Sequence, residues 1–131
     1  MDANTAPRIL VVEDDPPLRR LARVCLESMG LQVDEVSSGK NALLHLEKKT
    51  PALVCLDLML PEISGFDVCD HIRKTPRLSK IPVLIMSTRT HPVDRAYAEE
   101  AGAASYITKP FKIDEFQGEV RKLLRSTGAL Q

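Results

Sequence analysis

The sequence has little that would place the protein in a membrane, outside the cell or on nucleic acid. Its 131 residues contain no apolar run of the about 18 to 20 residues that a membrane-spanning helix needs. The N-terminal stretch MDANTAPR lacks the basic start and apolar segment of a secretory signal. Eighteen basic and eighteen acidic residues give a net charge of zero, without a basic stripe. We therefore expect a cytoplasmic protein with no membrane and no direct nucleic-acid binding.

Cysteine and histidine are also sparse and show no ligand spacing. The three cysteines, Cys25, Cys55 and Cys69, lie in apolar patterns without a CxxC pair, which favours buried thiols over a disulfide or a metal site. The histidines are scattered and are expected at the surface or at helix edges. They are His45, His71 and His91.

What the chain does contain is an alternation of apolar runs with helix-period segments. We expect strands at residues 9–12, 31–36, 52–56, 83–86 and 105–107. Three of these runs are continuous and β-branched, which is typical of parallel strands covered on both faces. Between them, apolar residues recur every three or four positions. This spacing predicts helices at residues 16–29, 38–48, 65–73, 92–101 and 113–125.

Local signals set the ends of the first helix and of the domain. Asp15 followed by two prolines is typical of a capped helix start, and Gly30 is a C-terminal stop. We assign residues 8–125 to one domain, with flexible ends at residues 1–7 and 126–131.

Strands alternating with helices predict an α/β, flavodoxin-like doubly wound fold, with five βα units layered as helices, sheet and helices. Right-handed crossovers place helices on both faces of a parallel five-stranded sheet. The expected strand order is 2-1-3-4-5, the common order for so short a chain. In such a sheet the functional crevice lies beyond the carboxyl ends of the strands, between the first and the third.

Polar residues collect where four of these strands end. Because the first and third strands are neighbours, the acids after one should converge with the acid after the other. Carboxylates at that range repel and need a cation. Oxygen ligands without imidazole or thiolate suit Mg²⁺ or Mn²⁺. The residues, in chain order, are Glu13, Asp14, Asp57, Ser87, Thr88 and Lys109.

The same cluster predicts phosphoryl transfer. A hydroxyl at Ser87 and an ammonium at Lys109 would contact phosphate oxygens, and Asp57 is the natural nucleophile. Taken singly, each residue has a plainer explanation: Asp15 as a helix cap, or Lys109 beside Pro110 as a surface lysine. The prediction rests on their conjunction at four strand ends.

The motifs VVEDD, LDLMLPEISGFD, VLIMST and YITKPF make the chain resemble the receiver domain of bacterial two-component response regulators, over residues 8–124. The resemblance implies that Asp57 accepts a phosphoryl group from a histidine kinase or phosphotransfer protein. It also implies that Glu13, Asp14, Asp57 and the backbone carbonyl of Met59 hold Mg²⁺. Beyond self-catalysed phosphorylation and dephosphorylation, no enzyme activity is expected.

The resemblance also assigns a switch. Ser87 takes the position of the switch hydroxyl, Tyr106 that of the switch aromatic and Lys109 that of the phosphate-contacting lysine, with a cis peptide before Pro110. Without the resemblance, the alternative explanation of Tyr106 is a packed aromatic on the last strand. Phosphorylation is expected to change the surface of the fourth helix, fifth strand and fifth helix, where a downstream protein would bind. We expect a monomer or weak dimer.

Compared with the family that the chain resembles, four residues bear on how the phosphate is reached. Glu13 stands where aspartate is more frequent, so its contact with the ion would pass through a water. Thr88 replaces a smaller residue and narrows the space for the phosphoryl group. The resemblance also implies that Met59 and Arg89 stand at the two positions that flank the path of an attacking water, and neither side chain can orient one. A comparatively long-lived phosphorylated form is therefore expected.

Other interpretations share parts of this pattern. A haloacid dehalogenase-type phosphatase needs a second acid two residues after its nucleophile, where this chain has Met59. In a flavodoxin-like cofactor carrier, three acids after the first strand would repel the phosphate. A degenerate receiver that only binds partners is disfavoured because every expected group is present. A stand-alone receiver and the receiver fragment of a longer regulator both agree with the sequence.

Overall fold

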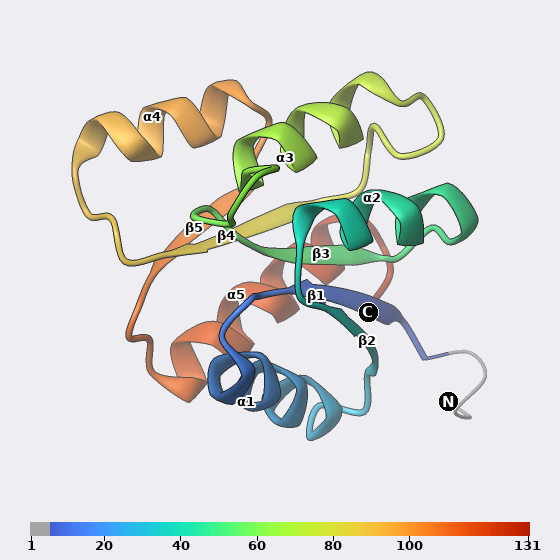
Figure 1. Cartoon of the computed structure of the whole chain (residues 1–131). Helices are drawn as coiled ribbons and strands as arrows, with labels where there is room; N and C mark the ends of the chain where they lie inside the picture. Colours follow the sequence, from blue (N-terminus) through green and yellow to red (C-terminus); the bar gives the residue numbers. More distant parts are fainter. Residues whose placement is uncertain (1–5) are drawn as a thin grey trace.

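The computed structural model describes residues 6–131, so most of the N-terminal segment predicted to be flexible lies outside the described residues. Five parallel strands form one sheet in the order β2-β1-β3-β4-β5 (Figure 1). The predicted doubly wound α/β fold and its strand order are confirmed. The strands are β1 (Arg8–Val12), β2 (Gln32–Val36), β3 (Leu53–Asp57), β4 (Val83–Ser87) and β5 (Ser105–Thr108).

Helices cover both faces of the sheet. Figure 1 shows α1 and α5 on one face and α2, α3 and α4 on the other. Side chains cap several helix starts: Asp15 accepts a hydrogen bond from the Leu18 N–H at 3.2 Å, as the sequence predicts. The helices are α1 (Pro16–Glu27), α2 (Gly39–Lys48), α3 (Gly65–Lys74), α4 (Pro92–Glu100) and α5 (Ile113–Ser126).

Alternating residues of the strands supply two hydrophobic cores. In β1, Ile9 and Val11 belong to the cluster that includes α1 and α5, whereas Leu10 and Val12 belong to the cluster under α2 and α3. All four are fully buried, and burying a side chain of this kind contributes about 1.5–3 kcal/mol. The two cores fix the strand register and therefore fix which residues reach the carboxyl edge of the sheet.

Several smaller expectations can be compared with the structure. The three cysteines are free and buried, as predicted. Residues 127–131 turn back after α5, and Ala129 and Leu130 pack against the core cluster that includes α1 and α5. Flexibility of the 126–131 tail remains a prediction. Among the described residues, no helix combines the length and hydrophobicity needed to cross a bilayer.

Candidate functional site

Three acids meet at the carboxyl ends of β1 and β3, which pair directly in the sheet. One carboxylate oxygen from each of Glu13, Asp14 and Asp57 lies within 4.8 Å of the other two. Glu13 and Asp57 are 1% and 4% exposed, whereas Asp14 is open to solvent. Asp57 is the last residue of β3 itself, so a strand buried on both faces delivers it to this point.

Lys109 supplies positive charge from the end of β5. Its ammonium nitrogen Nζ donates to Oε1 of Glu13 at 2.6 Å and lies 3.4 Å from Oδ2 of Asp57. Its backbone N–H donates to the carbonyl of Ser87 at 2.7 Å, and the Lys109–Pro110 peptide is cis, as the resemblance implies. The lysine is therefore held at the backbone while its side chain reaches across the acids.

The negative charge of the three acids is only partly balanced by the positive charge of Lys109. The pKa of Glu13 is raised to about 7: burial raises it most, the hydrogen bond from Lys109 lowers it in part, and the neighbouring carboxylate of Asp57 adds to the rise. The Lys109 ammonium pairs with two of the three carboxylates, those of Glu13 and Asp57. Carboxylate oxygens without imidazole or thiolate form a donor set that suits Mg²⁺, and a divalent cation would relieve their repulsion. The residues present therefore fit such an ion.

Two residues near Asp57 shape its surroundings: Met59, and Gly65, to which the sequence analysis assigned no role at the site. Oδ1 of Asp57 accepts a hydrogen bond from the N–H of Met59 at 3.0 Å, which orients the carboxylate. A Cβ atom on Gly65, at the start of α3, would lie 2.4 Å from the carbonyl oxygen of Asp57. Only glycine lets α3 begin this close to the strand end. The signal in the sequence was a glycine opening a helix eight residues after the acid.

Ser87 ends β4 and is completely buried. Its hydroxyl oxygen accepts a hydrogen bond from the N–H of Arg89 at 3.0 Å, and the carbonyl of Arg89 accepts one from the Tyr106 hydroxyl at 2.8 Å. The backbone of Arg89 thus connects the buried serine to the aromatic residue of β5. Thr88, which lies between Ser87 and Arg89 in the sequence, is exposed.

Two arginine side chains lie on the solvent side of the hydrogen bonds that link Ser87, Arg89 and Tyr106. The guanidinium of Arg89 pairs with Asp94 in the first turn of α4 at 3.1 Å, so Arg89 contacts α4. The guanidinium of Arg95 lies over the Tyr106 ring, 4.7 Å from its centroid. Sequence reasoning missed Arg95, because a contact between a helix and an edge strand leaves no local signal.

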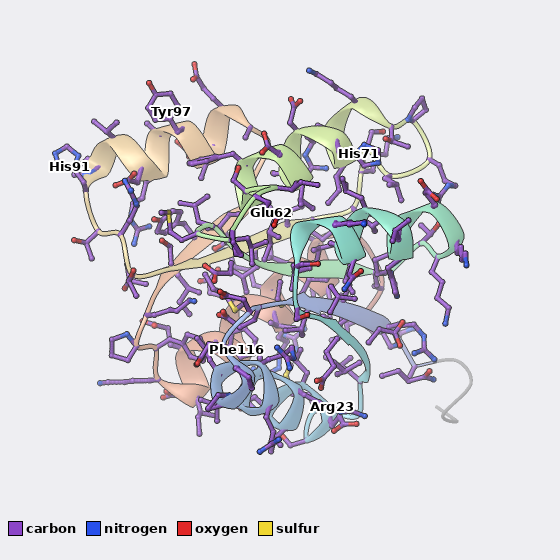
Figure 2. All side chains as sticks on the ribbon, in the orientation of Figure 1. Arg23, Glu62, His71, His91, Tyr97 and Phe116 are labelled. Carbon is purple, nitrogen blue, oxygen red and sulfur yellow. The ribbon has the colours of Figure 1, made fainter. Side chains whose placement is uncertain are left out.

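The histidines lie apart from this site. His71 on α3 and His91 before α4 are exposed and distant from each other (Figure 2). His45 on α2 is half-buried and pairs with Asp34 of β2 at 2.9 Å. None of the three belongs to the acidic cluster among the described residues.

The fold and the site together define a flavodoxin-like α/β domain with an acidic, oxygen-rich site at the carboxyl edge of its sheet. The family model of the response regulator receiver domain matches residues 9–121, and the chain belongs to this family of two-component signalling domains. The resemblance seen in the sequence is thereby confirmed. Receiver domains interact with histidine kinases, typically bind Mg²⁺ at an acidic pocket and are generally not classical enzymes.

Relatives cover nearly the whole chain. The DNA-binding dual master transcriptional regulator RpaA of Synechocystis sp. is 38% identical over 92% of this chain, and the DNA-binding response regulator MtrA of Mycolicibacterium smegmatis is 39% identical over 90%. The alignments cover 50% of both regulators, so the chain spans about half the length of the curated relatives it matches.

Solved structures agree with the family assignment. The signal receiver domain of a signal transduction histidine kinase from Syntrophus aciditrophicus has a TM-score of 0.88 at 32% identity, with 96% of each chain covered. The chemotaxis response regulator CheY4 of Vibrio cholerae has a TM-score of 0.86 at 23% identity, with 91% of this chain and 99% of that chain covered, and supports the fold.

Proposed function

We propose that Asp57 accepts a phosphoryl group from a histidine kinase or phosphotransfer protein, in a reaction that requires Mg²⁺. The observation that carries the proposal is the convergence of three carboxylates within 4.8 Å, next to Lys109. Asp14, Asp57, Glu13 and the backbone carbonyl of Met59 would hold Mg²⁺, or Mn²⁺ in its place. When bound, the ion would neutralise charge on the acids and on the phosphoryl oxygens.

The side chains divide the remaining work. Oδ1 of Asp57 is occupied by the N–H of Met59, which leaves Oδ2, on the Lys109 side, as the attacking oxygen. Lys109 then contacts a phosphoryl oxygen as a charged hydrogen-bond donor. Haloacid dehalogenase-type hydrolysis would need an acid at position 59, and methionine cannot serve as one.

A switch follows from the hydrogen bonds of Arg89. A Ser87 hydroxyl that moves toward a phosphoryl oxygen to donate to it would lengthen the hydrogen bond that it accepts from the Arg89 N–H. Because the Arg89 carbonyl accepts from the Tyr106 hydroxyl and its guanidinium pairs with Asp94, the change would reach β5 and the first turn of α4. The phosphoryl group would shift an existing equilibrium of this segment, and a downstream protein would bind the α4-β5-α5 face in the favoured state.

Phosphoryl labelling tests the acceptor. Incubation with Mg²⁺ and a small acyl-phosphate donor should add the mass of one phosphoryl group to the protein. The gain should disappear in Asp57→Asn and persist in the control Asp70→Asn, an exposed aspartate of α3 that pairs with Lys74. Asp14→Asn should lose the metal-dependent part, since it removes a carboxylate from the cluster. Full labelling of Asp57→Asn would refute the assignment.

Access of water to the phosphoryl group would set its lifetime. Met59 is 49% exposed beside the acceptor and cannot orient a water. In Met59→Asn, and in the double variant with Arg89→Asn, we expect autodephosphorylation to be about tenfold faster, which corresponds to ~1.4 kcal/mol. Leu44→Asn on α2, a residue 48% exposed, is the control. Decay measured at one Mg²⁺ concentration that is unchanged or slower in the Met59 variants would contradict occlusion.

A further inference from the structure

Helix α4 begins at a histidine whose ring caps the helix. The Val93 N–H donates to Nδ1 of His91 at 3.1 Å, and the Asp94 N–H donates to the His91 carbonyl at 3.0 Å. Pro92, in the first turn, has no N–H to satisfy. The ring and the carbonyl of His91 together therefore satisfy the first two backbone donors of α4.

The cap hydrogen bond fixes the protonation state of the His91 ring. A backbone N–H can only donate, so Nδ1 must accept with a lone pair, and the ring is neutral with its hydrogen on Nε2. Ser38 and Ser64 cap α2 and α3 with hydroxyl oxygens, which do not titrate near neutral pH. Histidine, in contrast, ordinarily changes its charge between about pH 5 and pH 8. The cap of α4 is therefore one that a proton can remove.

The charges around His91 do little to hold a proton on its ring. Asp94 is the acid of the first turn of α4, but its carboxylate already pairs with the guanidinium of Arg89 at 3.1 Å. Arg95, the next charged residue, lies over the ring of Tyr106. Among residues 6–131, no ion pair or side-chain hydrogen bond brings a group of another helix or strand to the His91 ring, and Figure 2 shows this ring at the outer end of α4. A positive ring would also lie at the positive end of the helix macrodipole.

The first turn of α4 is connected to the proposed switch residues through Arg89. The guanidinium of Arg89 pairs with Asp94, its N–H donates to the Ser87 hydroxyl oxygen at 3.0 Å, and its carbonyl accepts from the Tyr106 hydroxyl at 2.8 Å. If the first turn of α4 opens, Asp94 no longer holds the Arg89 side chain in place. The backbone of Arg89, and with it the hydroxyl of Tyr106, then becomes less restrained.

We propose that His91 is a pH-responsive cap, which closes the start of α4 when its ring is neutral and loosens the Arg89–Tyr106 connection when its ring is protonated. The proton comes from solvent and adds to Nδ1, and the N–H of Val93 then donates to water instead. The start of α4 is thus more stable above the range in which the ring titrates than below it. This inference goes beyond the proposed function, because it requires neither phosphorylation of Asp57 nor a bound ion.

Hydrogen exchange of α4 tests the cap. In the wild type, the protection of the backbone amides of residues 93–97, corrected for the intrinsic effect of pH on exchange, should fall about fivefold between about pH 7.5 and about pH 5.5. His91→Asn, whose side-chain oxygen can accept at either pH, should keep its protection, and His91→Ala should be poorly protected at both. His71→Asn, which changes an exposed histidine of α3, is the control and should follow the wild type.

NMR of the unphosphorylated protein tests the connection to Tyr106. The pKa of Glu13 is raised to about 7, so this acid titrates in the same interval, and each variant is compared with the wild type at equal pH. The amide signals of Arg89 and Tyr106 should follow the titration of the His91 ring in the wild type and lose this component in His91→Asn. An equal loss of α4 protection in the wild type and His91→Asn, or no loss in the wild type, would overturn the role of the cap. Signals of Tyr106 that do not follow His91 would overturn its connection to the switch residues.

Discussion

Glu13 and Asp34 are both carboxylates that lie beside basic side chains in the β1–β2 half of the sheet, yet their pKa values move in opposite directions. Asp34 sits in edge strand β2, hydrogen-bonds to His45 at 2.9 Å and pairs with Arg8 at 2.7 Å. Glu13 lies at the end of β1 and has Lys109 at 2.6 Å. The pKa of Glu13 is raised to about 7, and that of Asp34 is lowered.

Burial and partner number explain the difference. Burial also pushes the pKa of Asp34 upward, but the hydrogen bond to His45 and the charges of Arg8 and Lys49 outweigh it. Its side chain keeps 22% exposure. Glu13 is almost completely enclosed, so its one ammonium does not offset desolvation and the neighbouring acid. A compensated pair stabilises the fold, whereas an under-compensated one at a strand end leaves a site that favours an added cation.

The largest expected effect is on the pH dependence of stability. Between its ordinary pKa of 4.5 and about 7, Glu13 holds a proton in the native state that the unfolded chain has released. The free energy of unfolding should therefore fall as pH rises through this interval and stay low above it, by up to about 3 kcal/mol. Urea midpoints of metal-free protein across this range measure the effect.

Glu13→Gln should remove most of that pH dependence and raise the midpoint in alkaline solution. The neutral amide keeps nearly the size of glutamate but needs no counter-charge. Asp34→Asn is the matched control and should leave the slope between pH 4.5 and 7 intact. If the free energy of unfolding of Glu13→Gln still falls between pH 4.5 and 7, another group titrates in this interval. The contrast between Glu13 and Asp34 would then not hold.

Added Mg²⁺ should stabilise the protein through the acidic cluster that contains Glu13, and not through Asp34. An ion present at about 100 times its dissociation constant raises the free energy of unfolding by about 2.7 kcal/mol. We expect this gain in the wild type and in Asp34→Asn, and its loss in Asp14→Asn, measured as a shift in thermal midpoint. Stabilisation that survives Asp14→Asn would place the ion outside the acidic cluster.

Sequence reasoning reached the convergence of the acids because it depends on topology. Once parallel strands alternate with helices, the rule for strand order makes β1 and β3 neighbours, and their last residues must meet. Asp57 and Ser87 were expected just after their strands, and they are the final strand residues. The first helix was expected to reach residue 29 but ends at Glu27, since Ser28 and the next residues turn before Gly30.

The sequence could not predict which partners individual side chains contact. Whether Lys109 rests on Glu13 or Asp57 depends on a 0.8 Å difference that packing decides. Arg89 was expected across the path to the phosphate, and its pairing with Asp94 depends on where α4 begins. Gly65 matters only once the distance between α3 and the carbonyl of Asp57 is known. The spacing of apolar residues predicts where helices and strands lie, but it does not predict which of two contacts of similar length is the shorter.

The smallest expected effect concerns the compensated pair. Asp34 has a lowered pKa, so it contributes stability above the ordinary pKa of aspartate and loses that contribution as pH falls through the lower, native-state value. Asp34→Asn should therefore lower the free energy of unfolding by about 1 kcal/mol at neutral pH and by less in strong acid. Glu27→Gln, which breaks the exposed Arg23–Glu27 pair at 3.2 Å, is the control and should change stability by less than about 0.5 kcal/mol. Urea unfolding at the two pH values gives both differences. A loss in Asp34→Asn of the same size in acid would mean that packing against His45, and not charge, accounts for the effect, and the contrast with Glu13 would then rest on burial alone.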